Sequence, residues 1–179
     1  MRQSIGVAAA VIVSSLLVTS ASLAWAETSS VEGRESLTRA MQGAWLPLEG
    51  GLMVGEREGT PLSAKYEIDD GAFQLSIYTS KTGSSSGEAF MEVIVDYSAG
   101  MVLKAEPITD GGDLAAARAQ KEAMDRAKRS LAEATAAVVK AHAGYRAVSA
   151  TPRLENGQPV IEVTLVRGDD WKVVNERLD

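Results

Sequence analysis

Two stretches of sequence decide the fold: PLSAKYEIDDGAFQLSIYT at residues 61–79 and VSATPRLENGQPVIEVTL at residues 148–165. In each, apolar and polar residues alternate on both sides of a central Asp-Gly or Asn-Gly pair. Such alternation is typical of half-buried strands, and these pairs favour tight two-residue turns. Each stretch therefore predicts an antiparallel hairpin, one turning at Asp70-Gly71 and the other at Asn156-Gly157.

The two hairpins match each other at an offset of 86 residues, which aligns Leu62 with Val148 and Ala64 with Ala150. The same offset aligns the upstream residues Trp45, Leu48, Leu52 and Gly55 with Leu131, Ala134, Val138 and Ala141. Agreement across a helical pattern and two strands together predicts an internal repeat.

Further strands are predicted after each hairpin. In the first half, a flexible loop at Lys81–Gly87 leads to a third strand at Phe90–Asp96 and a fourth at Met101–Glu106, joined by a turn in which Gly100 suits a positive φ. The second half has only a third strand, Trp171–Leu178. The missing fourth strand predicts an open sheet edge there.

Helical patterns precede each group of strands. Residues 36–58 predict two short helices, divided where Pro47 suits the first helical position. Gly50, Gly51 and Gly55 indicate either a helix that lies close against a neighbour or a marginal helix. A long Ala-rich helix is predicted from an Asp113 cap to about residue 143, with a Ser130/Glu133 capping box that favours a break near 129.

The N-terminus predicts a secretory signal peptide. Arg2 is followed by an apolar or small-residue run from Ile5 to Val18, and Ala24-Trp25-Ala26 supplies the small-x-small pattern of a cleavage site. We expect cleavage after Ala26, a polar lead-in at 27–35 and a periplasmic or secreted product without a stable membrane anchor. The retained-anchor alternative would need a longer apolar run.

Composition limits the function classes. Without residues 1–26 the chain has 153 residues, 17 basic and 24 acidic, for a net charge of −7. Such a chain has no electrostatic reason to bind nucleic acid or anionic lipid. With no Cys, stability must come from core packing and not from disulfides.

These residues resemble the PepSY family of exported bacterial domains. The resemblance is carried by Leu48–Glu58, Leu62–Thr79 and Val95-Asp96-Tyr97-Ser98-Ala99-Gly100 in a first copy, and by Gly144–Val148 and Asn156–Val160 in a second copy at Ser130–Asp179. It implies an α+β fold of two repeats, each a helix packed on a small antiparallel sheet of three or four strands. The resulting organisation is a signal peptide (1–26), a lead-in with a short helix (27–45), a first repeat (46–112) and a long helix with a second, truncated repeat (113–179).

The family resemblance also implies a role. PepSY domains are associated with peptidase propeptides and with restraint of extracellular proteolysis, and the family is not enzymatic, so it implies no catalytic residues, cofactor or metal. The expected partner is therefore an envelope or secreted protein, such as a peptidase.

The chain offers little independent sign of catalysis. His142 is the only His and suits a helix C-terminus, and neither a nucleophile elbow nor a zinc motif is present. Two acidic clusters, Glu67–Asp70 and Gly168–Asp170, fall at predicted turns, where Asp is favoured for backbone reasons.

The sheet supplies the candidate partner-binding residues. They lie on the third strand of each copy and are Phe90, Glu92, Ile94, Trp171 and Val173. Trp171 is either an exposed anchor or a core residue. Two alternatives to protein binding remain: a carrier of a small apolar molecule between helices and sheet, and a carboxylate-based hydrolase, which would need two acidic side chains converging in one cleft.

Overall fold

A single antiparallel sheet of seven strands organises the chain in the computed structural model, which describes residues 31–84 and 87–179. The strands are β1 (Thr60–Asp69), β2 (Ala72–Ser84), β3 (Gly87–Val95), β4 (Val102–Pro107), β5 (Arg146–Glu155), β6 (Gln158–Arg167) and β7 (Asp170–Arg177). The helices are α2 (Val31–Met41), α3 (Leu48–Gly55), α4 (Gly111–Arg126) and α5 (Leu131–Ala141). The predicted signal peptide and its cleavage site after Ala26 lie outside the described residues.

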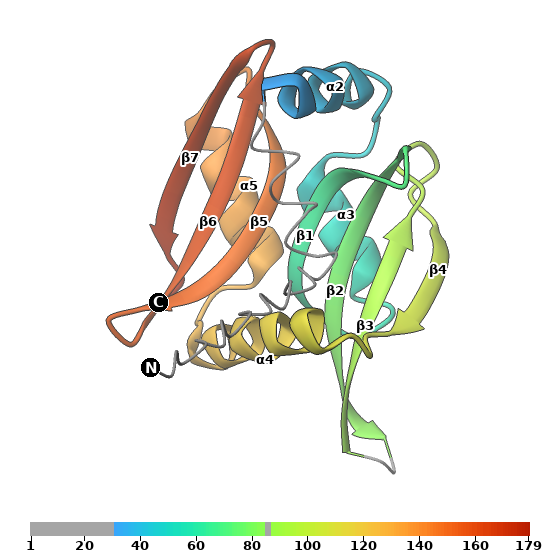
Figure 1. Cartoon of the computed structure of the whole chain (residues 1–179). Coiled ribbons are helices and arrows are strands. Elements are labelled where there is room, and N and C mark those ends of the chain that lie inside the picture. The colour runs from blue at the N-terminus through green and yellow to red at the C-terminus, as the bar shows by residue number, and fades with distance from the viewer. Residues whose placement is uncertain (1–30, 85–86) are drawn as a thin grey trace, which may run out of the picture.

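The strand order is β4-β3-β2-β1-β5-β6-β7 (Figure 1). The four strands of the first half and the three of the second therefore join edge to edge through β1 and β5, where Ala64 pairs with Ala150 and Lys65 with Ser149. The α+β class is as predicted. The union of both groups of strands in one sheet is a feature that the sequence pattern did not predict.

The two halves repeat in backbone detail at the offset of 86. The β1–β2 register shifts between Pro61 and Ser63, and the β5–β6 register shifts between Ala147 and Ser149. Both turn residues that precede glycine have a positive φ, 47° at Asp70 and 51° at Asn156. A positive φ at both central turn positions is what a two-residue hairpin of this twist requires, so both predicted turns are confirmed.

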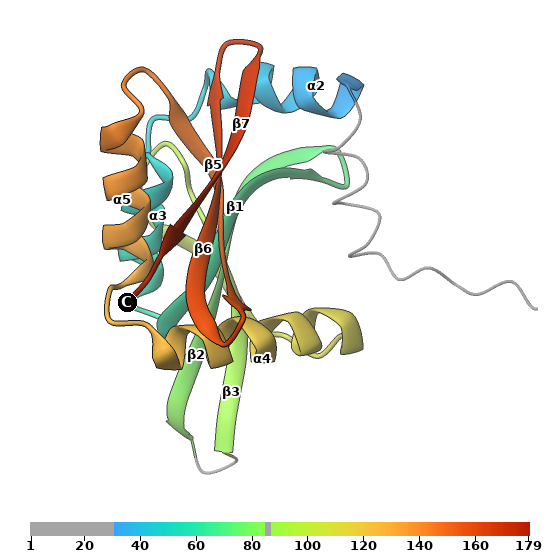
Figure 2. The same cartoon turned by 90° about the vertical axis from the view of Figure 1, so that its left-hand side faces the viewer.

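Helices α3 and α5 cover one face of the sheet, while α2 and α4 lie at opposite ends and project beyond the other face (Figure 2). The main core lies under α3 and α5 and includes Leu52, Leu75, Ile77, Val138 and Ile161. A second, smaller cluster lies under α4 and consists of Leu62, Tyr78, Phe90 and Ala117.

Close contact explains the glycines of α3. A Cβ on Gly51 would lie 2.5 Å from Leu75 Cδ2, and one on Gly55 would lie 2.9 Å from Ile77 Cγ2. The helix axis can approach the sheet only because these positions carry no side chain. Of the two interpretations of the glycines, close packing is the one that the structure supports.

Several predicted boundaries are corrected. Residues 31–35, predicted as a polar lead-in, are the start of α2, and Pro47 is the N-cap of α3 rather than its first residue. The N-cap of α4 is Asp110, whose carboxylate accepts hydrogen bonds from the N–H groups of Gly112 and Asp113, so Asp113 is not the cap.

One loop is shorter than predicted, and one predicted helix break is confirmed. The predicted loop at Lys81–Gly87 is mostly strand, since β2 extends to Ser84 and β3 begins at Gly87. The helical stretch after Asp110 breaks near 129 as predicted, into α4 and α5, and Ser130 and Glu133 form the predicted capping box.

Candidate functional site

The candidate site is the sheet face turned away from α3 and α5, which we call the open face. In a strand, side chains alternate between faces. Because Val93 and Val95 of β3 and Val174 of β7 pack into the main core, Glu92, Ile94 and Val173 project from the open face. Helices α2 and α4 bound this face at its two ends (Figure 2).

The predicted residues of the first half occupy different environments. Phe90 is buried beside Leu62, Tyr78 and Ala117, so it is a core residue of the α4 contact and not a free binding residue. Glu92 and Ile94 are half-buried on β3. Strand β3 is an interior strand, because β4 pairs with it along Met91–Val95.

The predicted residues of the second half lie on an outer strand. Val173 is 57% exposed. Trp171 is half-buried, packs at the margin of the main core and has the Arg34 guanidinium 5.7 Å from its ring centroid, a cation–π contact with α2. Trp171 is thus a packing residue at the end of the open face more than an isolated anchor.

The two groups of predicted residues occupy equivalent pairing positions in the two halves of the sheet. Phe90 pairs with Ser80 and Trp171 with Val166, while Glu92 pairs with Tyr78 and Val173 with Thr164. Four strands separate β3 from β7, so at about 4.8 Å per strand the groups lie about 24 Å apart. They share a face but do not form one compact site.

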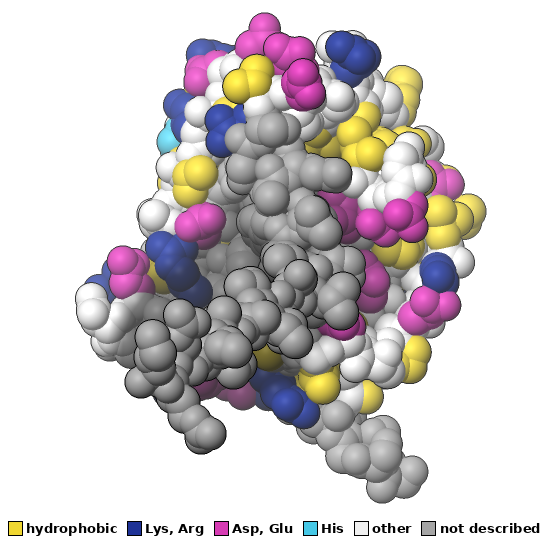
Figure 3. Space-filling view, viewed as in Figure 1, with side chains coloured by type: hydrophobic (Ala, Val, Ile, Leu, Met, Phe, Trp, Pro, Cys, Tyr) yellow, Lys and Arg dark blue, Asp and Glu magenta, His cyan; other side chains and the backbone are white. Residues whose placement is uncertain are grey.

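A cluster of polar side chains occupies the first half of the open face, where acidic side chains gather over β1 to β3 (Figure 3). The Glu67 carboxylate is buried and accepts hydrogen bonds from Ser76 Oγ at 2.6 Å and from Gln74 Nε2 at 3.3 Å. Lys65 Nζ lies 2.6 Å from its other oxygen. Burial raises the pKa of Glu92, and the nearby Glu67 carboxylate raises it further.

Sequence reasoning did not find this cluster. It placed Glu67 in an acidic turn, whereas the turn begins three residues later, at Asp70, and Glu67 lies on the sheet. The alternation of β1 put Lys65 and Glu67 on one face, but Ser76 and Gln74 reach them only through the β1–β2 register. Burial also raises the pKa of Tyr78, and Asp113 of α4, which accepts its hydrogen bond, raises it as well.

The remaining acidic residues lie at separate turns. Asp70 lies in the β1–β2 turn, whereas Asp170 opens β7 and accepts a hydrogen bond from the Tyr145 hydroxyl. That hydrogen bond lowers the pKa of Asp170. Among the described residues, no group of three or more Asp, Glu, His or Cys side chains is placed to hold a metal ion.

His142 has the predicted position at a helix end. It is the C-cap of α5, and its Nδ1 atom lies 2.8 Å from the carbonyl oxygen of Val138. Its ring also lies edge-on to Tyr145, with 6.4 Å between centroids. These contacts give it a packing and capping role.

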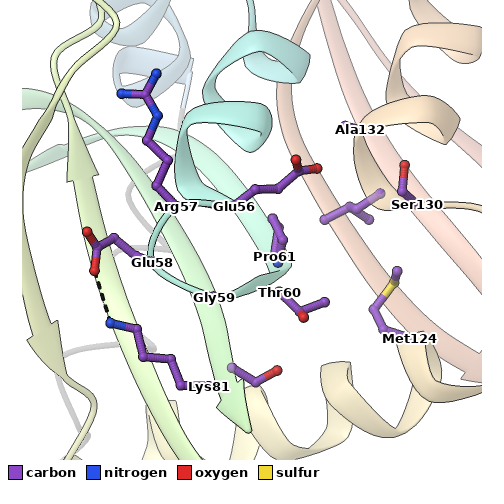
Figure 4. Close-up of a pocket in the computed structure, with 12 residues that line it drawn as sticks. Glu56, Arg57, Glu58, Gly59, Thr60, Pro61, Lys81, Met124, Ser130 and Ala132 are labelled. Carbon is purple, nitrogen blue, oxygen red and sulfur yellow. Dashed lines mark hydrogen bonds and ion pairs between the residues drawn. The ribbon is translucent and has the colours of Figure 1, made fainter.

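A groove of about 900 Å³ lies on the other side of the sheet, between the end of α3, the start of β1 and the start of α5 (Figure 4). Pro61, Met124 and Ala132 contribute apolar lining. Glu58 and Lys81 form an ion pair of 3.0 Å at the rim, beside Glu56 and Arg57. The rim charges balance, so the groove has no electrostatic preference for an anion or a cation.

Trp45 is an exposed aromatic residue that the sequence pattern placed on the apolar face of a helix. It lies instead in the α2–α3 connection, where its backbone N–H donates to the backbone carbonyl of Tyr97. The Trp45 side chain is 85% exposed. Its neighbour Pro47, which separates the helices, was the one sequence signal of this exposure.

Comparison of the chain with protein-family models, with curated proteins and with solved structures finds no match. In the part of the chain that the structure describes, no helix is both long and apolar enough to cross a membrane.

Proposed function

We propose that the chain is an exported, non-catalytic binding module with two PepSY-like repeats, and that its open face receives a secreted or envelope protein, with peptidases among the candidates. The observation that carries this proposal is the open face itself. In the part of the chain that the structure describes, it runs across both halves, lacks the helix layer that covers the opposite face, and presents Ile94 and Val173 beside charged groups. A mixture of apolar and polar groups on an accessible face is typical of protein-binding surfaces.

The two-repeat part of the proposal rests on the offset of 86. Bulges, turn conformations and strand pairing recur at this spacing in β1–β2 and β5–β6. Among the described residues the second half contributes three strands, β5 to β7, where the first contributes four. Export and cleavage after Ala26 rest on the sequence pattern of residues 1–26.

The two alternatives receive less support from the geometry. A carrier would use space created by the helix glycines, but Leu75 and Ile77 fill the space beside Gly51 and Gly55. A hydrolase would need Glu67 or Glu92 free to exchange protons with a substrate, and Glu67 is already engaged by Lys65, Ser76 and Gln74. The polar cluster around Glu67 and Glu92 is better suited to setting the polarity of the open face.

Photo-crosslinking tests the proposed surface. Residues 27–179 would carry a photoreactive amino acid at Val173 or, as a matched control, at Met53, which is 63% exposed on α3 in the opposite layer. After incubation with the envelope and secreted proteins of the producing cell, we expect one dominant partner to crosslink at Val173 and not at Met53.

Substitutions provide the second part of that test. Ile94→Asp and Val173→Asp place a charge on the open face and should weaken retention of the same partner, whereas Met53→Asp should not. A partner that crosslinks at Met53 or Trp45 and is unaffected by Val173→Asp would refute the open face as the binding surface.

A further inference from the structure

The outer strands β4 and β7 differ in how their free edges are protected. In antiparallel pairing, successive residues direct their backbone N–H and C=O groups alternately to one neighbour and to the other. The N–H of Leu178 donates to Pro159, which fixes this alternation, so the even-numbered residues of β7 bond to β6. The N–H and C=O groups of Trp171, Val173, Asn175 and Arg177 therefore point away from the sheet.

The equivalent backbone groups in the first half lie on β3, and they are hydrogen-bonded to β4 and the residue after it. Trp171 and Val173 correspond to Phe90 and Glu92, and the carbonyl of Phe90 accepts a hydrogen bond from the N–H of Ile108, just after β4. Strand β4 extends this pairing, with Glu106 opposite Glu92 and Lys104 opposite Ile94. In the described residues β7 pairs only with β6, so no strand lies beside β7 in the position that β4 takes beside β3.

The edge of β4 carries a device that blocks further pairing. By the same alternation Leu103, Ala105 and Pro107 direct their backbone outward, and Pro107 has no N–H to donate. Proline on an edge strand is a common protection against strand addition. Strand β7 contains no proline. The residues from 171 to 175 whose backbone groups point away from β6 are Trp171, Val173 and Asn175, and all three are uncharged.

Lys172 is the only charged residue from 171 to 175, and its side chain lies on the opposite face of the sheet from Val173. Lys172 Nζ lies 4.1 Å from the Tyr145 ring centroid, which is also contacted by Arg167. The far end of β7 is held firmly, because Leu178 is fully buried and its carbonyl accepts hydrogen bonds from the N–H groups of Lys128 and Arg129. The edge is thus a rigid, unprotected template.

We propose that β7 binds an extended segment of the partner protein, about as long as β4, as an eighth strand antiparallel to β7. The backbone groups of Trp171, Val173 and Asn175 pair with it. The residue opposite Val173 is apolar, since it covers a side chain that is 57% exposed, and the residue opposite Asn175 is polar. This inference rests on the proposed binding function and specifies how the partner is held.

A tethered strand tests the edge directly. A copy of residues 100–108, with valine in place of Glu106, would be attached after Asp179 through a short Gly-Ser linker, since Asp179 lies just past the end of β7, where an antiparallel strand would begin. Tethering gives a millimolar effective concentration. We expect hydrogen exchange of the Val173 and Asn175 amides to slow by at least about tenfold relative to the unextended chain.

The matched control keeps the same extension but carries proline in place of Lys104 and Glu106 in the copy, two of the positions whose N–H groups would bond to β7. It should leave the Val173 and Asn175 amides fast. The amides of Lys172 and Val174, which bond to β6, should be protected in every variant. Equal exchange at Val173 in the extended and unextended chains would overturn the proposal.

Partner capture separates this inference from the proposed function. The extended chain should lose the crosslink from Val173 to its natural partner, and the proline control should keep it. If capture persists while the tethered strand protects β7, the partner uses the open face but not the edge, and only the inference fails. If the unextended chain is a dimer with protected β7 amides, a second copy is the occupant and the partner-segment inference fails as well.

Discussion

Ala64 and Ala150, which are 86 residues apart and occupy equivalent register positions in the two halves, pair directly with each other across β1 and β5. An antiparallel pair of equivalent residues places a local pseudo-twofold axis between them. Both side chains are almost fully buried under α3 and α5. The sheet is therefore continuous because the first strand of each half lies beside the first strand of the other, which leaves the last strand of each half, β4 or β7, at the outside.

Enlarging Ala150 should strain this junction. Ala150→Leu adds three carbons to a site between the two halves and should lower the free energy of unfolding by about 1–3 kcal/mol, the usual cost of overpacking. Urea denaturation would measure it. Ser149→Val, directed to the open face one residue away, should change stability by less than about 0.5 kcal/mol. Equal effects of the two substitutions would contradict a tight junction.

Gly51→Ala should destabilise the chain although alanine favours helices. The gain in helix propensity is about 1 kcal/mol, but the new Cβ would lie 2.5 Å from Leu75 Cδ2 in a buried position, and overpacking costs about 1–3 kcal/mol. The double variant Gly51→Ala, Leu75→Val should recover part of the loss, because valine removes a carbon near the clash. Thermal denaturation of both single variants and the double variant would reveal the coupling.

Ser130 starts α5 through its capping box, accepting from the N–H of Glu133 at 3.2 Å while the Glu133 carboxylate accepts from the N–H of Ser130 at 3.1 Å. Ser130→Ala should cost about 1 kcal/mol in urea denaturation. Ser98→Ala is the control, since the contact with Asp96 uses the Ser98 backbone N–H, which alanine retains. A cost at Ser98 as large as that at Ser130 would show that the capping box has no special weight.

Local features of the fold could be predicted from the sequence because they depend on neighbouring residues. Asp70-Gly71, Asn156-Gly157 and Gly100 all have the expected positive φ, and the Ser130 capping box is confirmed. The pairing of β1 with β5 could not, because an alternating strand specifies which face it buries but not which strand lies beside it. The free edge of β7 was predictable, because the second half has no fourth strand to lie beside it.

The candidate site was predictable only in part. The third strands were identified, but the burial of Phe90 depends on α4 crossing the sheet, a tertiary contact with no local sign. The Glu67 cluster was missed because turn chemistry gave an adequate explanation for Glu67-Ile68-Asp69-Asp70. Only the sheet register brings Ser76 and Gln74 to the Glu67 carboxylate.

Glu92 should make stability depend on pH. Burial and the Glu67 carboxylate raise its pKa above the ordinary value of 4.5, so the folded chain binds this proton more tightly than the unfolded chain. As the pH rises above the ordinary value, the unfolded chain loses the proton first, and stability falls until the raised pKa is passed. Glu92→Gln removes this loss, so it should raise the Tm at about pH 7 and leave it unchanged below about pH 4.

Glu155→Gln serves as the control for the Glu92 measurement, because the Glu155 side chain is 57% exposed and its oxygen lies 3.8 Å from Arg153 in a surface ion pair. Surface pairs of this kind contribute little, so its Tm difference from the parent chain should be small at both pH values. The difference for Glu92→Gln should instead appear only on the neutral side. A Glu92→Gln variant that is less stable than the parent at neutral pH would mean that the Glu92 carboxylate is stabilised by its surroundings, and that the open face is less desolvated at β3 than its packing indicates.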